Sequence, residues 1–133
     1  MIDDLLAVAR SRIRRYSPAD AARADALIVD LRSDDERRRS GIVGGSIHVP
    51  RSVLEWRCDQ ESGFANSHLA QRRLILLCEH GYSSSLAAAS LVDLGLEDVG
   101  DIDGGFEAWC DAGLPVAAAP APGEGRPGMG GPA

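Results

Sequence analysis

A short apolar run that ends at a cysteine restricts the possible folds of this chain more than any other feature. Residues 71–78 are predicted to form a strand, because Leu74-Ile75-Leu76-Leu77 is continuous in the manner of strands buried on both faces. A helix is predicted over residues 84–94, where apolar side chains recur at helical spacing until Gly95. A buried strand followed closely by a helix indicates a parallel sheet covered by helices.

Strands and helices are predicted to alternate along most of the chain. Further strands are expected at residues 26–31, 46–50 and 99–102, and helices at residues 3–15, 18–24, 34–40 and 106–112, with one helical turn at 53–56. We therefore predict an α/β fold: a three-layer α/β/α domain with a mainly parallel central sheet.

The predicted domain occupies only part of the chain. We place it at residues 17–117, after an N-terminal helical extension at residues 1–16. The tail at residues 118–133 is rich in alanine, proline and glycine. Such a composition cannot bury a core, so the tail is expected to be disordered.

The distribution of charge argues against nucleic-acid binding. The 133 residues carry a net charge of −6 and include no lysine. Thirteen of the fourteen arginines precede residue 74, whereas residues 74–125 contain nine acidic side chains and no arginine. A nucleic-acid binder needs a basic stripe, so no nucleic-acid partner is expected.

Membrane association is not expected either. No apolar run approaches the ~20 residues that a membrane-spanning helix requires. The first residues include early acids and do not resemble a signal peptide. We therefore expect a cytoplasmic protein.

Three cysteines, Cys58, Cys78 and Cys110, lie far apart in the sequence. An odd and sparse set argues against a disulfide framework, and the absence of a closely spaced pair argues against a metal site. We interpret Cys58 and Cys110 as small apolar residues. Either could also serve as a resolving thiol, an alternative that the sequence leaves open.

Cys78 stands where the predicted strand ends and the next helix begins. A helix N-terminus offers free backbone N–H groups and the positive end of a dipole, which lower a thiol pKa and attract an anion. Gly81 allows the loop to curl tightly, and Ser83, Ser84 and Ser85 supply hydroxyl donors. The alternative is a buried cysteine followed by an ordinary capped helix.

Four segments, in the same order, resemble motifs of the rhodanese-like (thiosulfate sulfurtransferase-like) family. Cys78-Glu79-His80-Gly81-Tyr82-Ser83-Ser84 resembles its active-site loop, and Val29-Asp30-Leu31-Arg32 resembles its first Asp-x-Arg strand end. Residues 41–50 resemble its Gly-His-Ile-Pro-Gly-Ala-Ile-Asn-Ile-Pro segment, and residues 104–116 resemble its Gly-Gly…Trp…Gly-Leu-Pro-Val ending. The resemblance covers roughly residues 17–117.

The resemblance implies sulfur transfer that needs no cofactor. The Cys78 thiolate would attack the outer sulfur of a donor such as thiosulfate, become a persulfide, and pass the sulfur to an acceptor. The implied partners are a small sulfur-containing anion or persulfide donor, a thiol or cyanide acceptor, and a protein sulfur carrier. The implied substrate-binding residues are Glu79, His80, Gly81, Tyr82, Ser83, Ser84 and Arg32.

Two loop positions depart from the family pattern. Glu79 stands beside the cysteine where many members have a basic or neutral residue, and Ser83 stands where a basic residue is frequent. An acid beside the sulfur opposes thiolate formation unless it points to solvent. Any cation would then come from the N-terminal half, where the candidates are Arg32, Arg51 and Arg57.

For several of these residues a simpler interpretation is available. Arg32 is better suited to a structural salt bridge, with Asp30 as a candidate partner, than to substrate contact. Arg51 and Arg57 have the character of surface residues, and His80 that of a solvated loop residue.

Two other functions compete with sulfur transfer. A phosphatase on a related scaffold would need an arginine six positions after the cysteine, where this chain has Ser84. A rhodanese-like module that only binds a partner protein is the stronger rival, because Glu79 and the acidic C-terminal half favour it. The presence of Cys78 favours an enzyme.

Overall fold

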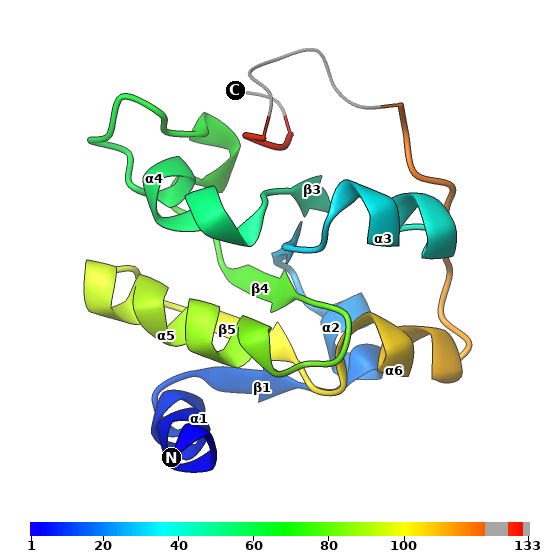
Figure 1. The fold of residues 1–133 in the computed structure, drawn as a ribbon, viewed down its shortest axis with the longest axis horizontal. Helices are drawn as coiled ribbons and strands as arrows, with labels where there is room; N and C mark the ends of the chain where they lie inside the picture. Colours follow the sequence, from blue (N-terminus) through cyan, green and yellow to red (C-terminus); the bar gives the residue numbers. More distant parts are fainter. Residues whose placement is uncertain (122–127, 132–133) are drawn as a thin grey trace.

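A five-stranded sheet in which all neighbouring strands are parallel forms the centre of the molecule (Figure 1). The computed structural model describes residues 1–121 and 128–131. The strand order is β1-β5-β4-β2-β3. The strands are β1 (Arg14–Tyr16), β2 (Leu27–Asp30), β3 (Ile47–His48), β4 (Leu74–Leu77) and β5 (Val99–Ile102). The predicted parallel sheet is confirmed.

Helices cover both faces of this sheet, which confirms the predicted α/β/α arrangement. One face is covered by α5 with α4 and α1 packed beside it, and the other by α2 and α6 (Figure 1). No helix in the described part of the chain is long and apolar enough to cross a membrane. The helices are α1 (Ile2–Ser11), α2 (Pro18–Arg23), α3 (Asp34–Ser40), α4 (Leu54–Cys58), α5 (Ser83–Leu94) and α6 (Gly105–Asp111), with 3₁₀ turns η1 (Arg51–Val53) and η2 (Ser67–Leu69).

β4 contributes side chains to the cores on both faces. Leu74 and Leu76 pack with residues of α4 and α5, whereas Ile75 and Leu77 pack with residues of α2 and α6. All four are fully buried, because successive side chains of a strand point to opposite faces. Burial of each stabilises the fold by roughly 1.5–3 kcal/mol before entropy is counted, so the strand that leads to Cys78 is firmly anchored.

The prediction of one helix over residues 3–15 is wrong at its C-terminal end. α1 ends at Ser11, and residues 14–16 form β1, which pairs with β5. These three residues contain no apolar run that would indicate a strand. The strand forms because its backbone satisfies the N–H and C=O groups along the edge of β5. The N-terminal extension therefore contributes to the central sheet.

The helix predicted at residues 34–40 and the strand predicted at 99–102 have the predicted ends, and the other elements are present with shifted ends. The strand expected at residues 46–50 shortens to β3, and the helical turn expected at 53–56 becomes η1 followed by α4. Part of the tail that we expected to be disordered has a defined place, because the Gly131 N–H donates to the His48 carbonyl at 2.6 Å. Residues 122–127 and 132–133 of that tail lie outside the described residues.

Candidate active site

Cys78 directly follows β4 at the carboxyl edge of the sheet and faces the start of α5. Its Sγ accepts hydrogen bonds from the backbone N–H of Gly81 at 3.1 Å and of Ser84 at 3.4 Å. The residue is only 7% exposed. The thiol therefore lies in the predicted position at the N-terminus of a twelve-residue helix.

The surroundings of Cys78 favour its thiolate. Burial raises the pKa of this thiol, but hydrogen bonds from the Ser83 and Ser84 hydroxyls and from the Ser84 and Gly81 N–H groups outweigh burial, and its pKa lies below the ordinary value. The Ser84 hydroxyl has one hydrogen and also bonds Asp101 at 2.7 Å. We therefore assign the effect mainly to the other three donors.

The other two cysteines have the opposite tendency. Burial raises the pKa of Cys58 to about 12. Burial also raises the pKa of Cys110, although that side chain is exposed. Of the three free cysteines, Cys78 is thus the one whose environment increases nucleophilicity at neutral pH.

Two glycines allow the loop after Cys78 to pack directly on the start of α6. Gly81 has φ +83°, and a Cβ there would lie 2.7 Å from the Gly104 nitrogen. A Cβ on Gly105 would lie 2.4 Å from the Cys78 carbonyl oxygen. This close approach lets the N–H groups of Phe106 and Glu107 bond the carbonyls of Cys78 and Glu79 at 2.9 and 3.1 Å, respectively.

The acid beside the sulfur is paired with a buried arginine. A Glu79 carboxylate oxygen lies 3.3 Å from Nη1 of Arg32. The Arg32 side chain is fully buried, bonds Asp30 at 3.0 and 3.1 Å, and lies over the Phe106 ring at 3.7 Å. The salt bridge with Asp30, left open by the sequence, is therefore present. Arg32 pairs with two carboxylates, and Asp30 has a second cation, because Arg37 lies 3.7 Å from it.

His80 and Tyr82 form the exposed side of the loop. The His80 Nδ1 lies 2.7 Å from the Glu107 carboxylate, and both side chains are mostly exposed. Tyr82 is 63% exposed, and the Arg10 guanidinium lies 5.6 Å from the centre of its ring. Both loop residues are therefore placed to meet a molecule that approaches from solvent.

The two other arginines proposed as loop cations have partners elsewhere. Arg51 pairs with Glu55 at 2.9 Å, and Arg57 donates to the carbonyls of Phe64 and Gly131. In the described residues, no group of three or more His, Cys, Asp or Glu side chains could hold a metal ion. A hollow of ≈ 500 Å³ lies at the opposite, amino edge of the sheet, beside Cys58, and so does not belong to the Cys78 site.

The geometry around Cys78 agrees with the comparison to known families. Residues 17–112 match the family model of the rhodanese-like domain. The chain belongs to the rhodanese-like family. The family predicted from the loop and the three accompanying segments is thereby confirmed.

Curated relatives extend this rhodanese-like assignment to an enzyme class. Thiosulfate sulfurtransferase GlpE of Pseudomonas entomophila is 39% identical over 103 residues, which are 74% of this chain and 86% of the relative. The protein of the same name from Stutzerimonas stutzeri is 38% identical over 86 residues, which are 65% of this chain and 72% of the relative. These relatives support the predicted rhodanese-type sulfurtransferase.

One similar solved structure has been described with a different possible function. A protein of unknown function from Rhodopseudomonas palustris, described as a possible tyrosine phosphatase, superposes with a TM-score of 0.82 and 36% identity, covering 87% of this chain and 93% of that one. In the present rhodanese-like loop, Ser84 occupies the position where a phosphatase would need arginine, and its hydroxyl bonds the buried Asp101. The loop thus lacks the guanidinium that would hold a phosphate.

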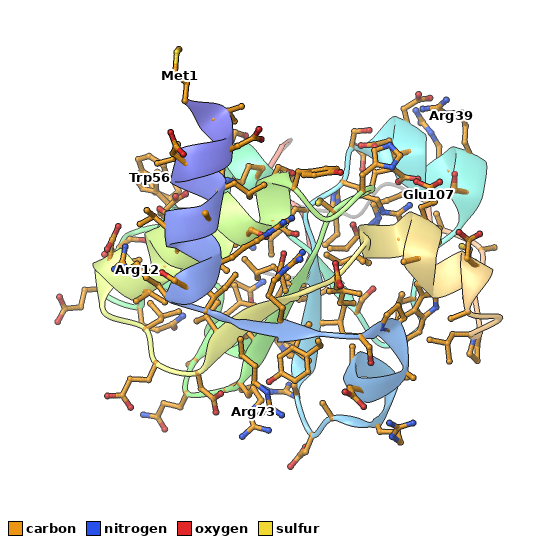
Figure 2. All side chains as sticks on the ribbon, turned by 90° about the horizontal axis from the view of Figure 1, so that it is seen from below. Met1, Arg12, Arg39, Trp56, Arg73 and Glu107 are labelled. Carbon is orange, nitrogen blue, oxygen red and sulfur yellow. The ribbon has the colours of Figure 1, made fainter. Side chains whose placement is uncertain are left out.

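Sequence reasoning missed two arginines that contact the loop from outside the matched rhodanese-like domain. Arg10 of α1 and Arg15 of β1 each donate an Nη2 hydrogen to the Gly81 carbonyl, at 2.8 and 3.0 Å. In Figure 2, α1 lies on one side of the loop and α6 on the other. The loop itself contains no arginine, whereas residues 10–15 contain several. That contrast is the only signal in the sequence that could have drawn attention to this segment.

Asp101 of β5 connects Arg15 with the first turn of α5. It is fully buried and accepts hydrogen bonds from the Ser84 and Ser85 hydroxyls, both at 2.7 Å, and from Arg15 at 3.0 Å. Sequence reasoning placed this aspartate on a strand and gave it no role. Its bonds fix the start of α5, whose N–H groups face the sulfur.

Proposed function

We propose that this chain transfers a sulfane sulfur through a persulfide on Cys78, with thiosulfate or another small sulfur-containing anion as the donor. The observation that carries the proposal is the pair of backbone N–H bonds to Sγ at the start of α5, in a site that lowers the thiol pKa. Such a thiol has a larger thiolate fraction at neutral pH than an ordinary cysteine.

The reaction consists of two displacements at sulfur. In the first, the Cys78 thiolate attacks the outer sulfur of thiosulfate, the new Sγ–S bond forms, and sulfite leaves with the electron pair of the broken S–S bond. In the second, cyanide or a thiolate attacks the outer sulfur of the persulfide, and the Cys78 thiolate leaves. No net oxidation or reduction of the enzyme occurs over the cycle.

The loop residues are assigned roles according to their positions. The N–H groups of Gly81 and Ser84, with the Ser83 hydroxyl, stabilise negative charge on Sγ and on the persulfide. His80 and Tyr82, both exposed, contact the donor or acceptor at the entrance.

Pairing of Glu79 with Arg32 weakens the argument for a module that only binds a partner. That alternative was based partly on an uncompensated acid beside the sulfur. Since the Glu79 carboxylate lies 3.3 Å from the buried Arg32 guanidinium, its charge is offset by a cation, and it opposes the thiolate less than the sequence suggests.

The partners follow from this chemistry. The donor is a small sulfur-containing anion or a persulfide, and the acceptor is a thiol or cyanide. A protein sulfur carrier could take the place of the small-molecule donor or of the acceptor. We also propose a cytoplasmic location, because a nucleophilic cysteine accompanied by two further free cysteines persists in a reducing compartment.

Mass spectrometry of the intact protein tests the proposal. After exposure to thiosulfate, the wild type should gain the mass of one sulfur atom on Cys78 and lose it to cyanide as thiocyanate. Cys78→Ser should abolish both events, whereas Cys110→Ser, the matched control at an exposed cysteine, should retain them. A Cys78 that stays unmodified by thiosulfate and by polysulfide would refute sulfur transfer.

A further inference from the structure

The peptide groups on the two sides of Gly81 have different partners. The Gly81 N–H donates to Cys78 Sγ at 3.1 Å. The Gly81 carbonyl accepts from Arg10 at 2.8 Å and from Arg15 at 3.0 Å. The two bonds use both lone pairs of this carbonyl oxygen, and because both donors are cationic they restrain it more strongly than neutral donors would.

We propose that Arg10 and Arg15 are positioning residues of the sulfur-transfer site, which hold the Gly81 carbonyl outward so that the N–H of Tyr82 faces the space over Cys78. The proposal rests on the proposed function and deepens it. It makes the N-terminal extension a part of the active site, although the matched rhodanese-like domain begins at residue 17.

The planarity of the peptide bond connects the arginines to the sulfur. The described residues contain no cis peptide bond, and in a trans peptide the C=O and the following N–H point in opposite directions. A carbonyl drawn toward α1 and β1 therefore turns the Tyr82 N–H away from them. The carbonyls of Cys78 and Glu79 are likewise drawn outward, by N–H groups at the start of α6.

The loop sequence alone does not select this orientation. A turn of the peptide that joins Gly81 to Tyr82 rotates ψ of Gly81 and φ of Tyr82, which is −102° here. Glycine accepts its part of this rotation at little steric cost, whereas tyrosine accepts positive φ less readily. The turned peptide would present its carbonyl to the sulfur, where it would repel a thiolate or an anionic donor. Two charged hydrogen bonds to that carbonyl oppose the turn.

Arg10 and Arg15 differ in whether their partners are charged. Arg15 also bonds the carboxylates of Asp101 and Asp103 at 3.0 Å. The partners that the described part of the chain gives Arg10 are all neutral: the Gly81 carbonyl, the Ser85 hydroxyl at 3.1 Å, and the Tyr82 ring. Arg10 therefore adds a positive charge beside a loop that contains no basic residue except histidine.

Arg12 provides a matched control for the test. It lies just beyond the end of α1 and pairs with Asp93 of α5, so it ties the extension to the same helix without touching the loop. If Arg10 acts only by docking α1, loss of either arginine should have the same effect.

The experiment compares Arg10→Ala, Arg10→Lys and Arg12→Ala with the wild type. The readouts are the pH profile of Cys78 alkylation by iodoacetamide, followed on the Cys78 peptide, and the thiosulfate KM. Arg10→Ala should move the alkylation profile to higher pH, with about three- to tenfold slower alkylation below neutral pH, and should raise KM by a similar factor. Arg12→Ala should keep the wild-type profile.

Arg10→Lys keeps the charge but loses the planar fork that bonds Ser85 and Gly81 together. It should give an intermediate profile, and it replaces Arg10→Ala in the comparison if thermal unfolding shows that the alanine variant does not fold. A wild-type profile in the Arg10 variants, or an equal displacement in Arg12→Ala, would overturn the proposal. Failure of sulfur transfer itself appears separately, as a wild type that forms no persulfide while its alkylation profile remains measurable.

Discussion

The Glu79 carboxylate lies 3.3 Å from the Arg32 guanidinium, so the acid next to Cys78 is bound to a buried cation. The same guanidinium bonds Asp30 through two of its nitrogens. Arg32 thus joins the end of β2 to the loop that follows β4. The consequence for stability can be measured.

Arg32→Met should lower the free energy of unfolding by about 3–5 kcal/mol, because it leaves the fully buried Asp30 carboxylate without this partner. Urea denaturation at neutral pH measures the change. The control is Arg39→Met, which removes an exposed pair with Asp35 and should cost less than about 1 kcal/mol. Similar losses in the two variants would contradict a structural role for Arg32.

Alkylation should select Cys78 although Cys110 is the more exposed thiol. The pKa of Cys78 is lowered and that of Cys110 is raised, so the thiolate fraction of Cys78 is larger at neutral pH. Brief iodoacetamide treatment followed by peptide mass spectrometry should find Cys78 modified first and the buried Cys58, with its pKa raised to about 12, last. Preferential modification of Cys110 would indicate that exposure, and not pKa, decides reactivity.

The stability conferred by Cys78 should increase with pH. Because its pKa is lowered in the folded state, the unfolded chain binds more protons between the folded pKa and the ordinary value of about 8.5. The unfolding free energy then rises with pH in that window, and the gain is lost as pH falls through the folded pKa. The difference between wild type and Cys78→Ser, measured by denaturation across this range, should grow with pH; a constant difference would show that the folded site does not favour the thiolate.

Gly81→Ala and Gly95→Ala should separate backbone strain from the contact that forms the loop. Both glycines have positive φ, but a Cβ at Gly95 meets nothing within 4 Å, whereas one at Gly81 meets Gly104 at 2.7 Å. Gly95→Ala should cost about 1 kcal/mol of stability and retain thiosulfate turnover. Gly81→Ala should cost more and reduce turnover at least tenfold, since it pushes the loop off α6. Equal turnover in the two variants would argue against a role for this contact.

Much of the fold and the position of Cys78 could be predicted because their signals are local. The apolar run of β4, the helical spacing of α5 and the glycine between them occupy adjacent positions, and strands and helices follow from such periodicities. β1 could not be predicted in this way. It is three residues long and has no apolar pattern, and it is a strand only because the edge of β5 lies beside it.

Which charged side chains lie near the loop could be seen only in the folded chain. Of the three arginines named by sequence reasoning, only Arg32 contacts the loop, through Glu79. The loop is also contacted by Arg10 and Arg15, which are 71 and 66 residues from Gly81. A long arginine side chain has no local preference for its partner, so the packing of α1 and β1 selects it. The sequence alone thus established the strand, the loop and Cys78, whereas tertiary packing decided which cations hold that loop in place.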